Sequence, residues 1–163
     1  ASLASFDRGP ESRGSSDRPS WFWVRPTAED ALYGVGQAKK QNPSLAKQTA
    51  TARARTEISQ AVNVKVASLL KDFMQESGIG DNAQATEFSQ AVTKQVTSNS
   101  LQGSAIKEAY VAKDGTIYIL VEYSLNSVRQ NALDAIKKEE ALYNEFKANQ
   151  GFDALEKAIS DLD

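Results

Sequence analysis

The sequence predicts an α+β domain. A three-stranded antiparallel sheet, formed in the order β-α-α-β-β, packs on one long helix and is followed by a C-terminal helical extension. Residues 45–75 contain no Gly or Pro and carry apolar side chains at four-residue steps, which is typical of a helix. Alternating apolar stretches flank Asp114-Gly115, a pair typical of hairpin turns. The apolar run 31–38 supplies the remaining strand.

The composition is that of an ordinary globular protein and excludes several classes of function. The chain has 163 residues, of which 40% are hydrophobic and 25% charged, with a net charge of -2. Such a chain is not a strongly basic nucleic-acid binder, so no nucleic-acid partner is expected. It contains no His and no Cys, which removes His-based triads, thiol nucleophiles and zinc fingers. No catalytic residue, cofactor or metal is predicted, and we expect a protein that is not an enzyme.

The N-terminal part of the chain combines a polar segment with an aromatic cluster. Residues 1–20 mix Ser, Gly, Pro, Arg and Asp, and we expect a flexible linker with a reach of about 25 Å. The cluster Trp21-Phe22-Trp23-Val24 follows. Two interpretations remain open: the cluster anchors the segment on the core of the domain, or it forms a hook for a partner or a membrane interface.

The first strand carries two glycines on one face, Gly34 and Gly36. Glycines in a strand indicate close approach of another backbone, and Ala50 and Ala54 of the long helix are small enough to allow it. Gly34-Val35-Gly36 is also half of a dinucleotide fingerprint. Lys39 stands where the third glycine would be needed, so nucleotide binding is rejected.

The long helix is expected to begin at Ser44 as its N-cap. Residues 62–66 alternate with period two as a strand would, but good helix formers flank them on both sides, so the helix is retained. A kink is expected there, because an unbroken helix of this length would overhang a short sheet. Arg53 and Glu57 are four residues apart and are expected to pair on the helix surface, whereas Arg55 faces elsewhere. A second helix is predicted over residues 83–98.

The hairpin predicts its own register. A two-residue turn places Tyr110 opposite Ile119, Val111 opposite Tyr118 and Lys107 opposite Glu122. The face with Tyr110 should be the core face. On the other face, Val111, Tyr118 and Leu120 need a cover, which the C-terminal helix or another subunit would supply.

The C-terminal extension is predicted to be helical. Asn126 or Ser127 is the expected N-cap of a helix to about Asn149, and Gln130, three residues after Ser127, favours Ser127. Gly151 ends this helix. A final short helix carries an apolar stripe, which docks on its own domain or contacts a neighbour. The stripe consists of Phe152, Leu155, Ile159 and Leu162.

An ordered set of short segments resembles a known family. The set comprises Pro19-Ser20-Trp21, Tyr33-Gly34-Val35-Gly36-Gln37-Ala38, Ala52-Arg53-Ala54-Arg55-Thr56-Glu57-Ile58, Leu101-Gln102-Gly103 and Gly115-Thr116-Ile117-Tyr118-Ile119-Leu120-Val121. In this order they resemble the Lpp-twenty family of bacterial membrane-associated lipoproteins, which is related to the flagellar lipoprotein FlgP. The match covers roughly Pro19 to Ser124. The family's lipidated Cys has no counterpart here, so the resemblance implies a lipid anchor upstream of Ala1.

The resemblance implies a non-enzymatic, lipid-anchored protein on the periplasmic side of the outer membrane. Such a protein would act as a structural or assembly component, in a homo-oligomer or in a flagellar motor-associated or other envelope complex. Its domains would be a tether over 1–20, the family domain over 21–124 and the extension over 125–163. The expected interface residues are Val111, Tyr118, Leu120, Phe152, Leu155 and Ile159. The alternative is a carrier of a small hydrophobic ligand or lipid, with Trp21, Trp23 and Tyr33 lining its pocket.

Overall fold

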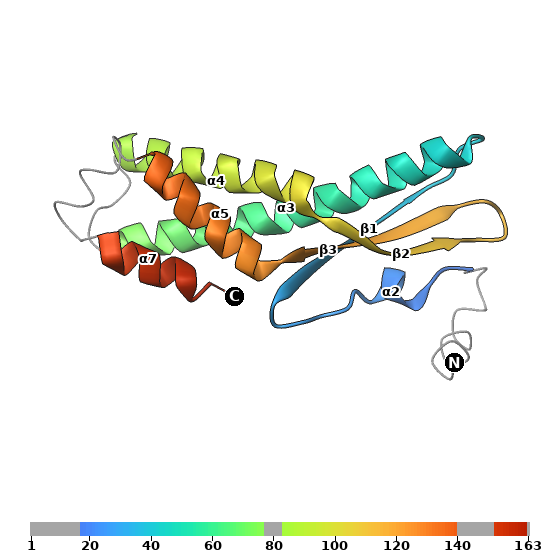
Figure 1. Cartoon of the computed structure of the whole chain (residues 1–163), viewed down its shortest axis with the longest axis horizontal. Coiled ribbons are helices and arrows are strands. Elements are labelled where there is room, and N and C mark those ends of the chain that lie inside the picture. Colours follow the sequence, from blue (N-terminus) through green and yellow to red (C-terminus); the bar gives the residue numbers. More distant parts are fainter. Residues whose placement is uncertain (1–16, 77–82, 140–151, 163) are drawn as a thin grey trace.

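The computed structural model describes residues 17–76, 83–139 and 152–162. It has the predicted α+β architecture, an elongated molecule with a sheet at one end and packed helices at the other (Figure 1). The elements are α2 (Ser20–Trp23), β1 (Ala31–Ala38), α3 (Pro43–Glu76), α4 (Ala83–Gly103), β2 (Ala105–Val111), β3 (Ile117–Ser124), α5 (Leu125–Lys138) and α7 (Phe152–Ser160). None of the described helices combines the length and apolar character that a membrane span requires.

The three strands form one antiparallel sheet in the order β1-β3-β2. The first strand pairs with the third from Ala31 opposite Ser124 to Ala38 opposite Ile117. Helix α3 packs on one face of this sheet and the short helix α2 lies on the other (Figure 1). Each face of the sheet therefore carries a helix, and the two helices differ greatly in length.

The two glycines of β1 bring α3 against the sheet, as predicted. A methyl group added at Gly34 would lie 2.4 Å from the carbonyl oxygen of Ala54, and one added at Gly36 would lie 2.1 Å from that of Ala50. Real side chains do not approach a backbone atom so closely. The strand and the helix can thus pack at this distance only because both positions lack a Cβ.

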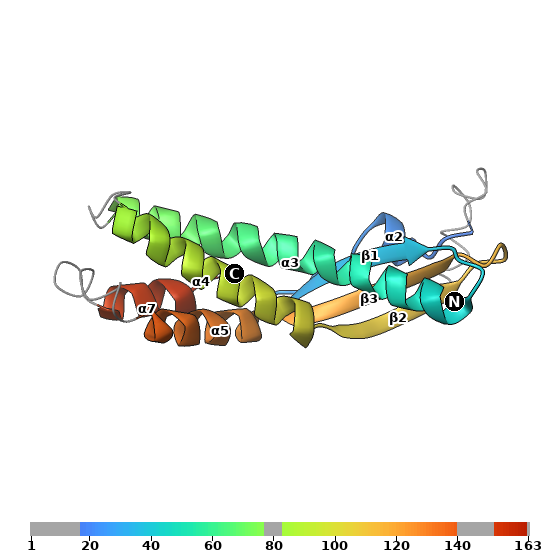
Figure 2. The same ribbon diagram turned by 90° about the horizontal axis from the view of Figure 1, so that it is seen from above.

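Helix α3 changes neighbours along its length. Its N-terminal half packs on β1 and β3 through Ala46, Ala50 and Ala54, and its C-terminal half continues past the sheet against α4 and α7 (Figure 2). It runs as one α-helix through residues 62–66, where a kink was expected. The part that extends beyond the sheet is covered by other helices. The buried row therefore winds around the axis and changes partner without a break in the helix.

The N-caps of two helices differ from the predicted ones. Asn42, not Ser44, caps α3, because its Oδ1 accepts hydrogen bonds from the backbone N–H groups of Ser44 at 2.8 Å and Leu45 at 3.2 Å. Ser124, not Ser127, caps α5, with its Oγ accepting from the N–H groups of Asn126 and Ser127. A cap residue needs extended backbone, which Ser124 has as the last residue of β3.

The hairpin register is shifted by one residue from the predicted one. The N–H of Ala112 donates to the carbonyl of Thr116 at 2.8 Å, so the loop has three residues, and its last, Gly115, has a φ of 93°. This is the turn that ends in a left-handed glycine. Val111 consequently lies opposite Ile117, and Tyr110 lies opposite Tyr118.

The register shift inverts the two faces of β2. Tyr110 points with Tyr118 to the outer face, their ring centroids 6.3 Å apart, instead of to the core. The core face of β3 is as predicted, with Ile117, Ile119, Val121 and Tyr123 buried. A bulge at Lys107 shifts the register again, and this residue still forms the predicted ion pair with Glu122, at 3.7 Å.

The helices after the hairpin form the core of the far end. Helix α4 extends to Gly103, five residues beyond the predicted end, and buries Phe88, Val92 and Val96. Helix α5 is described to Lys138, whereas Asn149 and Gly151 lie outside the described residues. In α7, Leu155 and Ile159 belong to the core, so this stripe docks on its own domain.

Candidate functional site

Strand β2 is the uncovered part of the sheet. All of its seven residues are exposed, whereas the neighbouring strand β3 is buried from Ile117 to Val121. The glycines of β1 centre α3 over β1 and β3, so β2 receives no helix on that face. The order β1-β3-β2 also makes β2 an edge strand. Its backbone edge and one face are therefore both open, a combination that invites pairing with another chain.

A groove of about 540 Å³ separates α3 from the β2 side of the sheet. Its apolar residues are Ala52, Leu101 and Ile106, and its cations are Lys47 and Arg55 of α3. Arg55 donates from Nη2 to the carbonyl of Ser104 at 3.3 Å. Its buried Nε has no hydrogen-bond partner within residues 17–76, 83–139 and 152–162. The groove suits an apolar segment with a polar or anionic edge.

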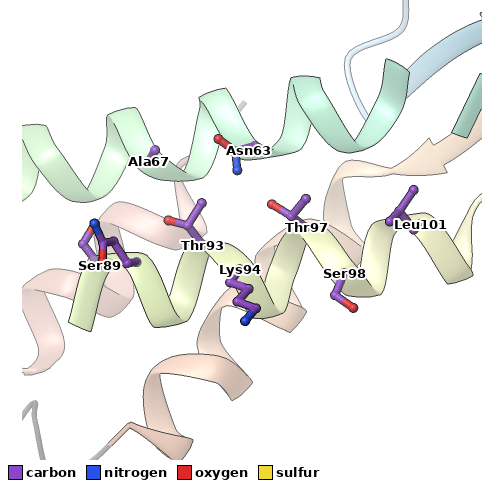
Figure 3. A pocket seen from close by; sticks show the side chains of 9 residues that line it. Asn63, Ala67, Ser89, Thr93, Lys94, Thr97, Ser98 and Leu101 are labelled. Carbon is purple, nitrogen blue, oxygen red and sulfur yellow. The ribbon is translucent and has the colours of Figure 1, made fainter. Parts of the chain in front are cut away.

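A second groove, of about 500 Å³, runs between α3 and α4 (Figure 3). Thr93 and Thr97 of α4 point toward Asn63 and Ala67 of α3, and both hydroxyls lack a partner among the described residues. Lys94 is the titratable residue that lines it. Small polar side chains of this kind let two helices approach closely, but they supply no acid–base pair.

The outer face of the sheet is covered by part of the chain's own N-terminal segment, which we define as residues 17–30. Phe22 of α2 packs edge-on against Tyr118 at a centroid distance of 5.0 Å. The cover that the sequence requires therefore comes from α2, and Phe22 of the aromatic cluster anchors this helix on the domain. Arg25 and Asp17 secure the same segment on either side of α2.

The predicted interface residues are distributed unequally. Tyr118 and Leu120 are buried in β3, where Phe22 packs against Tyr118, and Leu155 and Ile159 are buried in the helical core. The side chain of Phe152 lies outside the described residues. Val111 is 64% exposed. Burial within one chain thus leaves Val111, with its β2 neighbours Ile106 and Tyr110, as the large apolar side chains of the sheet that are more than a third exposed.

The three residues predicted to line a ligand pocket have other neighbours. Trp23 is 52% exposed, and the guanidinium carbon of Arg18 lies 5.0 Å from the centroid of its ring. Trp21 is half-buried on the same short helix. Tyr33 donates from its hydroxyl to Glu122 at 2.8 Å, and this hydrogen bond raises the pKa of Tyr33. Both described grooves are lined by other residues.

The predicted pair of Arg53 and Glu57 does not form. Glu57 instead binds Arg25 through two hydrogen bonds of 2.8 and 3.0 Å and accepts the N–H of Val35 at 3.1 Å. Arg53 donates to the carbonyl of Gln37 at 2.8 Å. Glu57 points toward β1 and the N-terminal segment, where a guanidinium and a backbone N–H both bind it. The hydrogen bond with Glu57 raises the pKa of Arg25.

A second polar contact fixes the start of the N-terminal segment. The carboxylate of Asp17 accepts hydrogen bonds from the hydroxyl of Tyr110 and, at 2.6 Å, from the N–H of Lys113. The hydrogen bond from Tyr110, followed by that from Lys113, lowers the pKa of Asp17. The same contact raises the pKa of Tyr110. The carboxylates of Asp17 and Glu57 thus attach segments of the chain to one another.

The described residues do not assemble a recognisable centre for chemistry. Within them, no group of three or more His, Cys, Asp or Glu side chains could hold a metal ion. Glu57, Glu122 and Asp17 each already bind a tyrosine or an arginine. The features that stand out are therefore surfaces: the open strand β2, the groove beside it and the exposed part of α2.

Comparison with known proteins agrees with the resemblance noted in the sequence. No curated protein matches the chain, and no solved structure matches it. The family model described as LPP20 lipoprotein matches residues 19–124, from the N-terminal segment to the end of β3. This is not a known enzyme family, and the match fits a lipoprotein of the cell envelope. The chain therefore belongs to the LPP20 lipoprotein family.

Proposed function

We propose that this chain is a non-enzymatic structural or assembly component of a complex on the periplasmic side of the outer membrane, and that it joins a second copy of itself through β2. The observation that carries this proposal is the exposure of β2 on its face and along its edge. Pairing of two edge strands satisfies the free backbone groups of both. Because a second copy presents the same edge, such pairing closes after two chains.

The apolar side chains of β2 support this pairing. Ile106, Tyr110 and Val111 are each more than a third exposed, and Leu101 stands beside them in the groove along α3. Full burial of an aliphatic side chain of this size contributes about 1.5–3 kcal/mol. The bulge at Lys107 interrupts the ladder, so the regular part of the edge that is available for pairing is Glu108–Val111.

The experiment measures mass by light scattering over a range of concentrations. The chain should shift from monomer to dimer, and Val111→Lys should move that shift to higher concentration. Val64→Lys is the matched control, because Val64 on α3 is also 64% exposed. A chain that stays monomeric throughout, or an equal effect of the two substitutions, would overturn the proposal. Thermal melts of both variants test whether the fold is retained.

We further propose that residues 1–20 serve as the tether to a lipidated Cys upstream of Ala1. Family membership supports a lipoprotein, and this segment reaches the described part of the fold at Asp17. Residues 125–163 would form an extension that completes the helical core, since Val128, Ala132 and Ile136 of α5 are buried. Mass spectrometry of the protein extracted from membranes tests the anchor, and an unmodified N-terminus would contradict it.

A further inference from the structure

One end of the molecule carries an excess of positive charge. The hairpin tip, the connection from β1 to α3 and the start of the N-terminal segment meet there in both views (Figures 1 and 2). We call this the tethered end and define it by its charged residues: Arg18, Lys39, Lys40, Lys47 and Lys113, with Asp17 and Asp114 as its carboxylates. The cations outnumber the carboxylates and are all exposed, although the chain as a whole has a net charge of -2.

Polar contacts hold these groups at one end. Lys39 forms an ion pair with Asp114 of the hairpin at 3.8 Å, which joins the β1–α3 connection to the tip. The hydrogen bond from the N–H of Lys113 to Asp17 places the start of the N-terminal segment at the same tip. The residues that precede Asp17 contain as many Arg as acidic side chains, so their own charges do not cancel the excess.

Apolar groups adjoin this charge on the side of α2. Trp23 is 52% and Val24 77% exposed, and the guanidinium of Arg18 stacks over the ring of Trp23. An indole beside cationic side chains is typical of protein segments at the boundary between water and lipid headgroups. Contact with such a boundary would account for the exposure of Trp23 and Val24, while Phe22 anchors α2 on the sheet.

We propose that the tethered end rests on a surface of anionic phospholipid, with its lysines near the headgroup phosphates and Trp23 at the interface. The inference rests on the proposed lipid anchor, because a tether holds this end near the membrane and makes a weak contact effective. Charge determines the orientation. An anionic surface repels the net negative chain but attracts this one end, over about 10 Å at moderate salt.

The test uses the unlipidated chain. A failure to bind vesicles would then contradict the proposed membrane contact without bearing on the proposed lipid anchor. Co-sedimentation is measured with vesicles of phosphatidylcholine alone and with added phosphatidylglycerol. The variant Lys39→Gln/Lys40→Gln/Lys113→Gln removes charge from the tethered end. The control Lys71→Gln/Lys137→Gln/Lys138→Gln removes the same charge from exposed positions on α3 and α5. We expect binding to the anionic vesicles, weakened about fivefold or more by the first variant and unchanged by the control.

Fluorescence gives a second readout. Trp21 and Trp23 are the two tryptophans of the chain, so Trp21→Phe leaves Trp23 as its single reporter. Its emission should shift to the blue on anionic vesicles at low salt and return when salt is raised. Equal loss of binding in both lysine variants, equal binding to the two kinds of vesicle, or an unshifted emission would each overturn the proposal.

Discussion

Glu57 and Arg25, although 32 residues apart in sequence, form a bidentate ion pair with hydrogen bonds of 2.8 and 3.0 Å. This ion pair links α3 to the N-terminal segment, which carries α2 on the outer face of the sheet. The same carboxylate also accepts the N–H of Val35 in β1. One side chain thus joins the helix, the sheet and the N-terminal segment.

The two partners of this pair should contribute unequally to stability. Both are more than a third exposed, so Arg25→Ala should lower the free energy of unfolding by less than about 1 kcal/mol. Glu57→Ala also leaves the part-buried N–H of Val35 without its acceptor and should cost about 1–3 kcal/mol. Urea denaturation measures both values. The reverse order would show that the carboxylate is not the acceptor for β1.

The glycines of β1 should be far less tolerant than the glycine of the hairpin. Gly36→Ala forces a methyl group against two backbone atoms of α3, at 2.1 and 2.6 Å, and should cost about 3 kcal/mol. Gly34→Val should be similarly harmful. Gly115→Ala meets nothing within 4 Å but strains a φ of 93°, and should cost about 1 kcal/mol. If Gly36→Ala melts like the wild type, the packing of β1 on α3 described here is incorrect.

The helix caps provide matched pairs of substitutions. Asn42→Ala should lower stability by about 1 kcal/mol, because two N–H groups of α3 lose their acceptor, whereas Ser44→Ala should have little effect. Ser124→Ala and Ser127→Ala should differ in the same way at α5. Chemical denaturation of the four variants tests the assignment, and a larger loss at Ser44 or Ser127 would restore the caps expected from the sequence.

Attachment of the N-terminal segment should depend on pH through Asp17 and Tyr110. Folding lowers the pKa of Asp17. The stability that this carboxylate contributes is therefore present above the pKa of the unfolded carboxyl and is lost as pH falls through the pKa in the folded chain. Folding raises the pKa of Tyr110, so the stability that its hydroxyl contributes is present below the pKa of the unfolded phenol and is lost as pH rises through the pKa in the folded chain.

Tryptophan emission from α2 reports both the acidic transition of Asp17 and the alkaline transition of Tyr110. The emission should stay constant between these two transitions and change at each extreme of pH. Tyr110→Phe should move the acidic change to higher pH, because it removes the main cause of the low pKa of Asp17. Asp17→Asn should abolish that change. If the acidic transition is the same in Asp17→Asn as in the wild type, another carboxyl attaches the segment.

The sequence alone was sufficient for the strands, for the position of the long helix and for one of their contacts. The strand Ala31–Ala38 has the predicted bounds, α3 covers the predicted helical segment, and the hairpin turns at the predicted Asp114-Gly115 pair. Gly34 and Gly36 predicted the close approach of α3. These features depend on residues within a few positions of each other, or on the absence of a side chain, and both can be read along a single segment.

Tertiary structure decided which groups meet. The left-handed conformation of Gly115 shifted the hairpin by one residue and inverted the faces of β2, because side chains alternate along a strand. Glu57 took Arg25 in place of Arg53, and α2 covered Tyr118. Among the described side chains of the predicted interface, Val111 remained exposed. Local pattern shows that a face is apolar. Which segment covers that face depends on the path of the whole chain, and this path is not encoded in the spacing of neighbouring residues.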